Sequence, residues 1–212
     1  MDKKVYVFDF DGTLTTRDTL LLFIRFSKGE WAFWLGMLLY APLLVLMKLR
    51  LLDNGRVKER VFSHFFRGSR ESTFDYWCEL FADICSDIIR PEGMAAIRKA
   101  RADGDDVFVV SASIDRWVRP FFMQTNPSSG ELIAGSEIAS IVCTEIEIVD
   151  GRLTGRFSTP NCYGKEKVRR LRQAVPDLHD YDEIIVYGDS RGDKALFEIA
   201  TERHYKPFRS EE

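Results

Sequence analysis

Polar side chains stand where three apolar, strand-like segments of the sequence end. Asp9 and Asp11 follow the segment VYVF, Ser111 closes VFVVS, and Asp189 follows IIVYG. Side chains alternate along a strand, so Asp9 and Asp11, two residues apart, point to the same side. Ligands of parallel sheets bind in a crevice outside the carboxyl ends of the strands. We therefore expect these four groups to converge, although they are far apart in the sequence.

The expected cluster of three carboxylates requires a counterion. Like charges a few ångströms apart cannot all stay ionised in a low dielectric. Oxygen ligands without a nearby nitrogen or sulfur ligand favour Mg²⁺, which typically binds through one or two carboxylates, water and a substrate phosphate. The pattern predicts a Mg²⁺ site at Asp9, Asp11 and Asp189 that accepts a phosphate group.

The segments around these residues predict a parallel α/β sheet. Residues 4–10 predict a strand, and residues 92–103 predict a helix that stops at Gly104. The apolar runs DVFVVSAS and DEIIVYGDS are typical of strands that are covered on both faces. The stretch CTEIEIVDGRLTGRF alternates and predicts a hairpin that turns at residues 150–151. Strands that alternate with helices favour the parallel arrangement.

Residues 18–87 read as helices, with breaks expected near Gly29, Pro42, Asn54–Gly55 and Gly68. Within them, residues 31–47 carry no charge and are flanked by basic residues on both sides. A membrane-crossing helix needs about 20 apolar residues, and Pro42 interrupts this run. Two interpretations remain: a buried helical hairpin bent at Pro42, or a segment in the membrane interface whose basic flanks (Arg25, Lys28, Lys48 and Arg50) meet lipid phosphates.

Composition limits the classes of function. With 45% hydrophobic residues among 212, the chain can bury a core in one or two domains. A net charge of -3, without a basic stripe, argues against a nucleic-acid partner. The four cysteines show neither a CxxC pair nor a metal-ligand spacing with the histidines, so we expect reduced thiols. No signal-peptide pattern precedes the first strand, and we expect a cytoplasmic protein, peripheral at the inner membrane face if residues 31–47 contact lipid.

Four motifs in order, DFDGTLT, VFVVSAS, GKEKVRRL and GDSRGD, resemble those of the haloacid dehalogenase (HAD) superfamily of phosphohydrolases. The helical insert after the first motif resembles the C1-type cap of the phosphoserine phosphatase-like branch, subfamily IB. This resemblance implies a three-layer Rossmann-like core of residues 1–15 and 88–212, and a helical cap of residues 16–87. It also implies a Mg²⁺-dependent phosphatase.

The resemblance assigns roles to individual residues. Asp9 would be the nucleophile that forms an aspartyl-phosphate, and Asp11 would be the general acid and then the general base. Mg²⁺ would be held by the Asp9 carboxylate, the Asp11 main-chain carbonyl and Asp189. Ser111 and Lys167 would hold phosphate oxygens.

Further residues complete the expected site. Lys167 is favoured over Lys165 because it fits the K-x-x-x-L pattern of the third motif, which leaves Lys165 at the helix start. Asp193 would orient the lysine or a metal-bound water, and Ser113 is expected to cap a helix. The residues Gly12, Thr13 and Ala112 are expected next to the substrate.

The cap is expected to choose the substrate. Asp18 would meet a substrate amine or serve as a helix N-cap. The basic residues Arg56, Lys58 and Arg60 are expected to meet a substrate carboxylate or second phosphate, or else to lie on a solvated helix face, and Arg60 is the one assigned to the substrate. The long apolar insert also resembles the phosphatidylglycerophosphatase C-like subgroup, which leaves a small phosphorylated metabolite and a phospholipid head group as alternatives.

Two other classes of function remain as alternatives to a phosphatase. A receiver domain also accepts phosphate on an Asp beside Mg²⁺, but its phosphorylated Asp stands mid-chain. A membrane-associated scaffold built on residues 31–47 would leave the converging acids unexplained.

Overall fold

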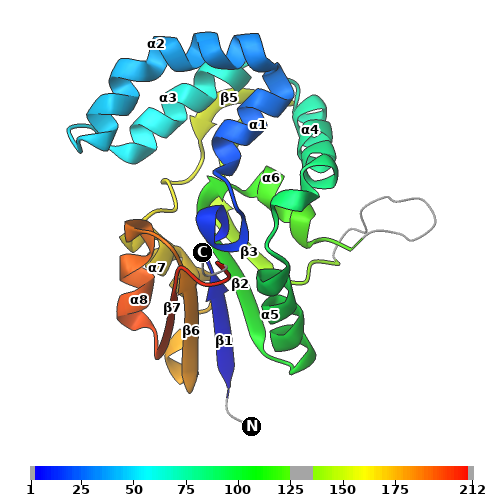
Figure 1. Cartoon of the computed structure of the whole chain (residues 1–212), viewed down its shortest axis with the longest axis vertical. Coiled ribbons are helices and arrows are strands. Elements are labelled where there is room, and N and C mark those ends of the chain that lie inside the picture. Colours follow the sequence, from blue (N-terminus) through cyan, green and yellow to red (C-terminus); the bar gives the residue numbers. More distant parts are fainter. Residues whose placement is uncertain (1–2, 125–135, 210–212) are drawn as a thin grey trace.

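The strand that leads into Asp9 is the central strand of the sheet. The computed structural model describes residues 3–124 and 136–209, in which five parallel strands follow the order β3-β2-β1-β6-β7 (Figure 1). Because β1 lies between β2 and β6, the segments that follow these three strands meet at one edge of the sheet. The strands are β1 (Lys4–Phe8), β2 (Asp106–Ile114), β3 (Ser140–Thr144), β6 (Glu183–Gly188) and β7 (Glu202–Tyr205).

Helices cover both faces of this sheet. Val5 and Val7 pack with buried side chains of α7 (Lys165–Ala174) and α8 (Lys194–Ile199) on one face. Phe8 belongs to the core of the opposite face, where α5 (Pro91–Ala102) packs. This alternation along β1 follows from the two-residue period of a strand. The predicted three-layer Rossmann-like fold is confirmed.

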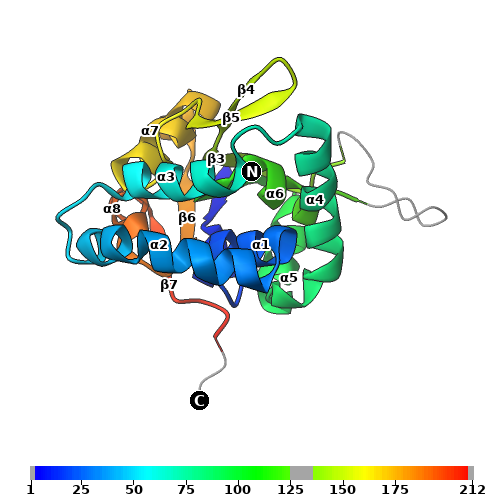
Figure 2. The same cartoon turned by 90° about the horizontal axis from the view of Figure 1, so that it is seen from above.

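Four helices follow β1 and lie over the carboxyl ends of the strands (Figures 1 and 2). Their shared core is aromatic: the ring of Phe23 contacts Phe66, Phe74 and Phe81 at centroid distances of 5.3–5.5 Å. Asp18 and Asp53 cap helices, with carboxylates that accept from main-chain N–H groups. The helices are α1 (Thr19–Lys28), α2 (Glu30–Lys48), α3 (Asn54–Phe66) and α4 (Glu71–Ile84); a short α6 (Asp115–Val118) follows β2.

The predicted hairpin forms from β4 (Ile146–Val149) and β5 (Arg152–Phe157). It packs against α3 rather than joining the main sheet. Gly155 has φ 85°, and a Cβ there would lie 2.5 Å from the Ser63 hydroxyl of α3, so this close approach requires glycine. The hairpin thus lies with the helical layer, although it was predicted within the core range of residues 88–212.

The predicted break at Pro42 is wrong, because α2 runs without interruption from Glu30 to Lys48. Proline removes the hydrogen bond to the carbonyl four residues earlier, but apolar residues continue on both sides of it. The interpretation as a buried hairpin is wrong as well. Among the residues of α2 only Phe33 and Gly36 are buried, whereas Trp31 is 91% exposed and Leu38 is 75% exposed.

Candidate active site

The turn after β1 brings the first motif against the fourth. The Asp9 N–H donates to the carbonyl of Tyr187 at 2.9 Å, which extends the pairing of β1 with β6. Gly12 follows with φ 79°, a conformation that side chains with a Cβ rarely adopt. A Cβ at Gly12 would lie 2.4 Å from a carboxylate oxygen of Asp189. Glycine is therefore needed both for the turn and for the close approach of Asp189.

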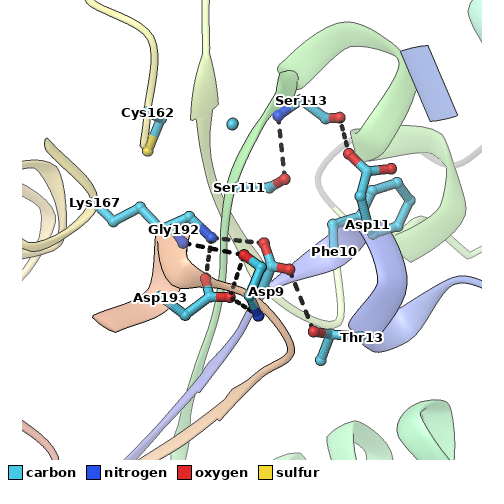
Figure 3. Close-up of polar contacts among 12 residues, drawn as sticks. Asp9, Phe10, Asp11, Thr13, Ser111, Ser113, Cys162, Lys167, Gly192 and Asp193 are labelled. Atoms are coloured by element: carbon cyan, nitrogen blue, oxygen red, sulfur yellow. Dashed lines mark hydrogen bonds and ion pairs between the residues drawn. The ribbon is translucent and has the colours of Figure 1, made fainter. Parts of the chain in front are cut away.

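Lys167 is fully buried between two carboxylates (Figure 3). Its Nζ donates to Asp9 Oδ1 at 2.6 Å and to Asp193 Oδ1 at 2.6 Å. Lys165, at the first position of α7, is exposed. The structure thus brings Lys167, and not Lys165, to the predicted nucleophile.

Asp193 is held in place by the loop after β6. Its Oδ2 accepts from the main-chain N–H groups of Asp189 (3.2 Å) and Ser190 (3.0 Å) and from the Ser190 hydroxyl (3.0 Å). Its Oδ1 is left for Lys167. These contacts are those expected of a group that orients the lysine.

The charges of this cluster do not cancel. Burial raises the pKa of the Asp9 carboxyl to about 7, and although Lys167 opposes the shift, the negative charge of Asp193 adds to it. Burial would lower the pKa of Lys167, but Asp9 and Asp193 outweigh it and raise that pKa above its usual value. Because a single lysine faces two buried carboxylates, the pKa of Asp9 stays raised unless further positive charge binds nearby.

A divalent cation fits this donor set. In the described part of the chain, carboxylate oxygens of Asp9, Asp189 and Asp193 lie within 4.8 Å of one another. Asp189 also accepts from Arg209 Nη2 at 2.8 Å. An all-oxygen donor set that carries excess negative charge suits Mg²⁺. The expected cluster of the Asp9, Asp11 and Asp189 carboxylates is wrong in one member, because Asp193 lies in the group and the carboxylate of Asp11 lies outside it. The family resemblance implied only the main-chain carbonyl of Asp11 as a ligand.

Asp11 joins the predicted core to the cap. Its Oδ1 accepts from the main-chain N–H (2.8 Å) and the hydroxyl (2.6 Å) of Thr19, and its Oδ2 accepts from the Ser113 hydroxyl (Figure 3). Thr19 begins α1 and accepts in turn from Trp117 Nε1 at 3.2 Å. The acid is thus anchored where the helical layer meets β2.

Thr19 and Ser113 were not predicted as site residues. The expectation that Ser113 caps a helix is wrong, because the N-cap of α6 is Ile114 and the Ser113 hydroxyl donates to Asp11. A signal was available for Ser113: it stands two residues after Ser111 in one strand, which places both side chains on the same side. No comparable signal marks Thr19.

Of the other predicted residues, Ser111 and Ala112 line the pocket of the site, whereas Gly12 and Thr13 lie outside its lining. Ser111 is buried, and its Oγ accepts from the Ser113 N–H at 3.1 Å. The Thr13 hydroxyl donates to Asp9 Oδ2 at 3.2 Å. The carbonyl of Ala112 accepts from Lys58 Nζ of α3 at 2.6 Å.

A pocket of about 350 Å³ opens above these groups. Asp18 lines its rim while its carboxylate accepts from the Leu21 N–H at 3.1 Å, so the N-cap expected for Asp18 is present. Lys58 also lines the pocket, and burial lowers its pKa. Arg60 is exposed and lies outside the lining, so the structure does not bring this predicted residue to the site. The side of the pocket formed by α1, α2 and α3 is mainly apolar, with Asp18, Asn54 and Lys58 as its polar residues.

Comparisons with known proteins identify the family and the fold. The haloacid dehalogenase-like hydrolase family matches residues 6–198, a span that contains all four motifs. Protein CicA of Caulobacter vibrioides is 32% identical over 205 residues, covering 95% of this chain and 85% of that protein. A protein of unknown function from Bordetella pertussis superposes with a TM-score of 0.77 at 22% identity, covering 96% of this chain and 89% of that chain. A substrate-bound phosphoserine phosphatase superposes with a TM-score of 0.64 at 15% identity, covering 97% and 86%.

Proposed function

Because the chain belongs to the haloacid dehalogenase-like hydrolase family, we propose that this enzyme hydrolyses phosphomonoesters through a phosphorylated Asp9 in a Mg²⁺-dependent reaction. The observation that carries the proposal is the buried Asp9–Lys167–Asp193 cluster, with Asp11 and Asp189 at the same edge of the sheet. It supplies a carboxylate nucleophile, a fixed cation and oxygen donors for a metal.

In the first step a carboxylate oxygen of Asp9 bonds to phosphorus while the ester P–O bond breaks. The leaving oxygen takes a proton from Asp11, which must therefore start the step protonated. Asp11 is placed for this by Thr19 and Ser113, whose hydroxyl groups stabilise its charged form afterwards. The products of the step are the free alcohol and an aspartyl-phosphate.

In the second step water attacks phosphorus, and its proton passes to Asp11. The bond between phosphorus and the Asp9 oxygen breaks, which releases phosphate and restores the carboxylate. Both steps move negative charge onto the phosphoryl oxygens, and Lys167 and the Ser111 hydroxyl are the nearby donors that would stabilise it. Asp193 keeps Lys167 charged and aimed at Asp9.

Asp9, the main-chain carbonyl of Asp11 and Asp189 are the residues proposed to hold Mg²⁺. When bound, the ion supplies positive charge that neutralises the phosphoryl group and orients it for attack. Asp9 would then no longer face an excess of negative charge, and its carboxylate would stay ionised.

Two classes of ester remain within the proposal. A small phosphorylated metabolite of the phosphoserine type would place its amine near Asp18 at the rim. A lipid phosphate of the phosphatidylglycerophosphate type would place its head group on the floor and its apolar part against the upper walls. The enzyme would be cytoplasmic in the first case, and peripheral at the inner membrane face in the second.

The test is turnover of p-nitrophenyl phosphate. We expect Mg²⁺-dependent hydrolysis that is abolished by EDTA and by Asp9→Asn. As a matched pair, Lys167→Met should lose activity while Lys165→Met, at the exposed start of α7, should keep it. Full activity in excess EDTA would overturn the metal requirement. Phosphorylation of the protein without turnover would favour the receiver alternative.

A further inference from the structure

The pocket has two chemically distinct parts. Its floor holds the carboxylates, Ser111 and Lys167. Its upper wall carries Asn54 and Lys58 but is mainly apolar, formed by Leu20, Met37, Leu44, Met47, Val57 and Val61. A phosphate ester of a small polar alcohol would leave that wall in contact with water. An ester whose alcohol carries hydrocarbon would cover this wall and remove its apolar surface from water, which favours binding of such an ester.

Helix α2 contributes to this wall with one side and faces solvent with the other. Its solvent side carries a continuous apolar stripe along the whole helix, defined here as Trp31, Leu35, Leu38, Pro42, Val45 and Leu49. In Figure 1 this helix forms the end of the molecule farthest from the sheet. Exposed apolar patches of this extent mark interaction sites. The helix that walls the pocket thus also presents an unpartnered apolar surface.

Charge indicates what covers the stripe. The only acidic residue of α2, Glu30, is already paired with Arg25. Lys48 and Arg50, at the other end, are exposed and form no ion pair within the described ranges. An apolar stripe with tryptophan at one end and unpaired cations at the other suits an anionic bilayer surface.

Length and composition would also allow α2 to cross a membrane, but its packing opposes this. Phe33 and Gly36 are buried, and a Cβ on Gly36 would lie 2.2 Å from the Phe65 ring of α3. If α2 crossed the membrane it would separate from α3, and the Phe65 ring would lose its contact with Gly36. If α2 lies flat in the membrane interface, its packing against α3 is retained.

We infer that the apolar stripe of α2 docks the enzyme on anionic membranes, and that the pocket takes an amphiphilic phosphomonoester from the bilayer, with the phosphate on the acidic floor and hydrocarbon against the Met37–Leu44–Met47 wall. The substrate part of this inference rests on the proposed phosphatase function, whereas the docking part does not.

Docking is tested on the unmodified protein with vesicles of phosphatidylcholine, with and without phosphatidylglycerol. Trp31 is 91% exposed and Trp34 60%, whereas Trp117 is buried, so insertion of α2 should shift the tryptophan emission to shorter wavelength. We expect the shift and co-sedimentation only with anionic vesicles, and loss of the shift in a protein that combines Trp31→Phe with Trp34→Phe. Each of Lys48→Gln and Arg50→Gln should weaken binding about fivefold at low salt. The absence of both signals at low salt would overturn the docking.

Paired variants separate docking from folding. Leu38→Glu with Leu39→Glu changes two exposed residues of α2, and Tyr76→Glu with Ile84→Glu changes two residues of α4 that are each 59% exposed. Only the first pair should abolish vesicle binding, with p-nitrophenyl phosphate turnover retained by both. Equal binding by both pairs would contradict the stripe as the docking surface. The wild-type protein could instead sediment as a dimer and bind no vesicles. If Leu38→Glu with Leu39→Glu then converts this dimer to a monomer, the stripe is the contact with a second copy of the chain and the docking inference is wrong.

The substrate class is tested with phosphatidic acid in the same vesicles and glycerol 3-phosphate in solution, which share the phosphoglycerol group. We expect kcat/KM to favour phosphatidic acid by roughly tenfold or more, since its hydrocarbon removes the apolar pocket wall from water, and covering about 60 Å² of that wall already supplies this factor. Equal values, or a preference for glycerol 3-phosphate, would overturn the amphiphilic substrate. If p-nitrophenyl phosphate, phosphatidic acid and glycerol 3-phosphate are all untouched, the phosphatase proposal fails and the substrate inference fails with it, while the vesicle measurements still decide the docking.

Discussion

At the scale of single residues, Asp9 and Asp11 have different surroundings, although only one residue separates them. Asp9 is buried and bonded to Lys167, whereas the Asp11 carboxylate turns toward the hydroxyl groups of Thr19 and Ser113. These surroundings match a nucleophile that needs charge balance and an acid that exchanges protons.

Asp11→Asn should therefore slow the reaction without removing the site. We expect kcat for p-nitrophenyl phosphate to fall by about 10²–10⁴-fold, because each proton transfer loses its catalyst. Binding of Mg²⁺ and orthovanadate, measured by calorimetry, should persist, since Asn keeps the main-chain carbonyl. Loss of vanadate binding would instead assign Asp11 to holding the phosphate.

The raised pKa of Asp9 predicts a pH-dependent affinity for Mg²⁺. The carboxyl pKa is about 7 in the metal-free protein, and the metal binds the carboxylate form. As the pH falls below about 7, binding must displace a proton, so the affinity should drop about tenfold per pH unit; above that pH it should level off. Calorimetry in buffers of different ionisation enthalpy would count the released proton. An affinity that does not change across this range would contradict the charge balance described for the cluster.

Sequence patterns predicted the residues that end apolar strands, because a carboxylate after a buried strand has few structural uses. Asp9, Asp11, Ser111 and Asp189 reach one edge of the sheet as expected. Lys167, which lies on a helix and was predicted only from the resemblance to the third motif, reaches the same place. Thr19 was not predicted, and Arg60 was chosen over Lys58 although Lys58 lines the pocket, because the positions of these residues depend on how the helices pack over the sheet.

At the scale of elements, the packing of α2 on α3 depends on one glycine. Gly36→Leu should destabilise the fold by about 1–3 kcal/mol, because the added side chain collides with Phe65. Ala32→Leu, at an exposed position of the same helix, is the control and should change stability little. Urea unfolding measures both variants. Equal stability of the two would show that α2 does not need this close contact.

The errors in the predicted elements have separate physical causes. β7 has the sequence ERHY, without the apolar run of a buried strand, because it lies at the edge of the sheet. The last residues of β3, Cys143 and Thr144, were assigned to the hairpin because their alternation continues into β4. At Pro42 the missing hydrogen bond was weighed as a break, but the apolar sequence on both sides keeps α2 helical.

At the scale of the whole molecule, the acidic cluster links metal binding to stability. In the metal-free protein, the raised pKa of Asp9 lowers stability as the pH rises from the usual carboxyl pKa to about 7, because over this range the unfolded chain has released the proton that the folded protein still holds; above about 7 the loss is complete and constant. Mg²⁺ should therefore raise the melting temperature more above pH 7 than below it. At a hundredfold excess over Kd the stabilisation is about 2.7 kcal/mol.

Asp189→Asn should reduce this gain, whereas Asp180→Asn, on the exposed surface, should not. Differential scanning calorimetry with and without Mg²⁺ provides the comparison. A melting temperature that Mg²⁺ leaves unchanged on both sides of pH 7 would contradict a metal site at this cluster.

The central claim is that Asp9 carries the phosphoryl group between the two steps. The direct measurement is to quench the enzyme with borohydride during turnover of p-nitrophenyl phosphate, which reduces an acyl phosphate on aspartate to homoserine, and to sequence the peptides by mass spectrometry. We predict homoserine at position 9, dependent on substrate and absent from Asp9→Asn. Turnover without homoserine at any position, or homoserine at position 11, would contradict the account.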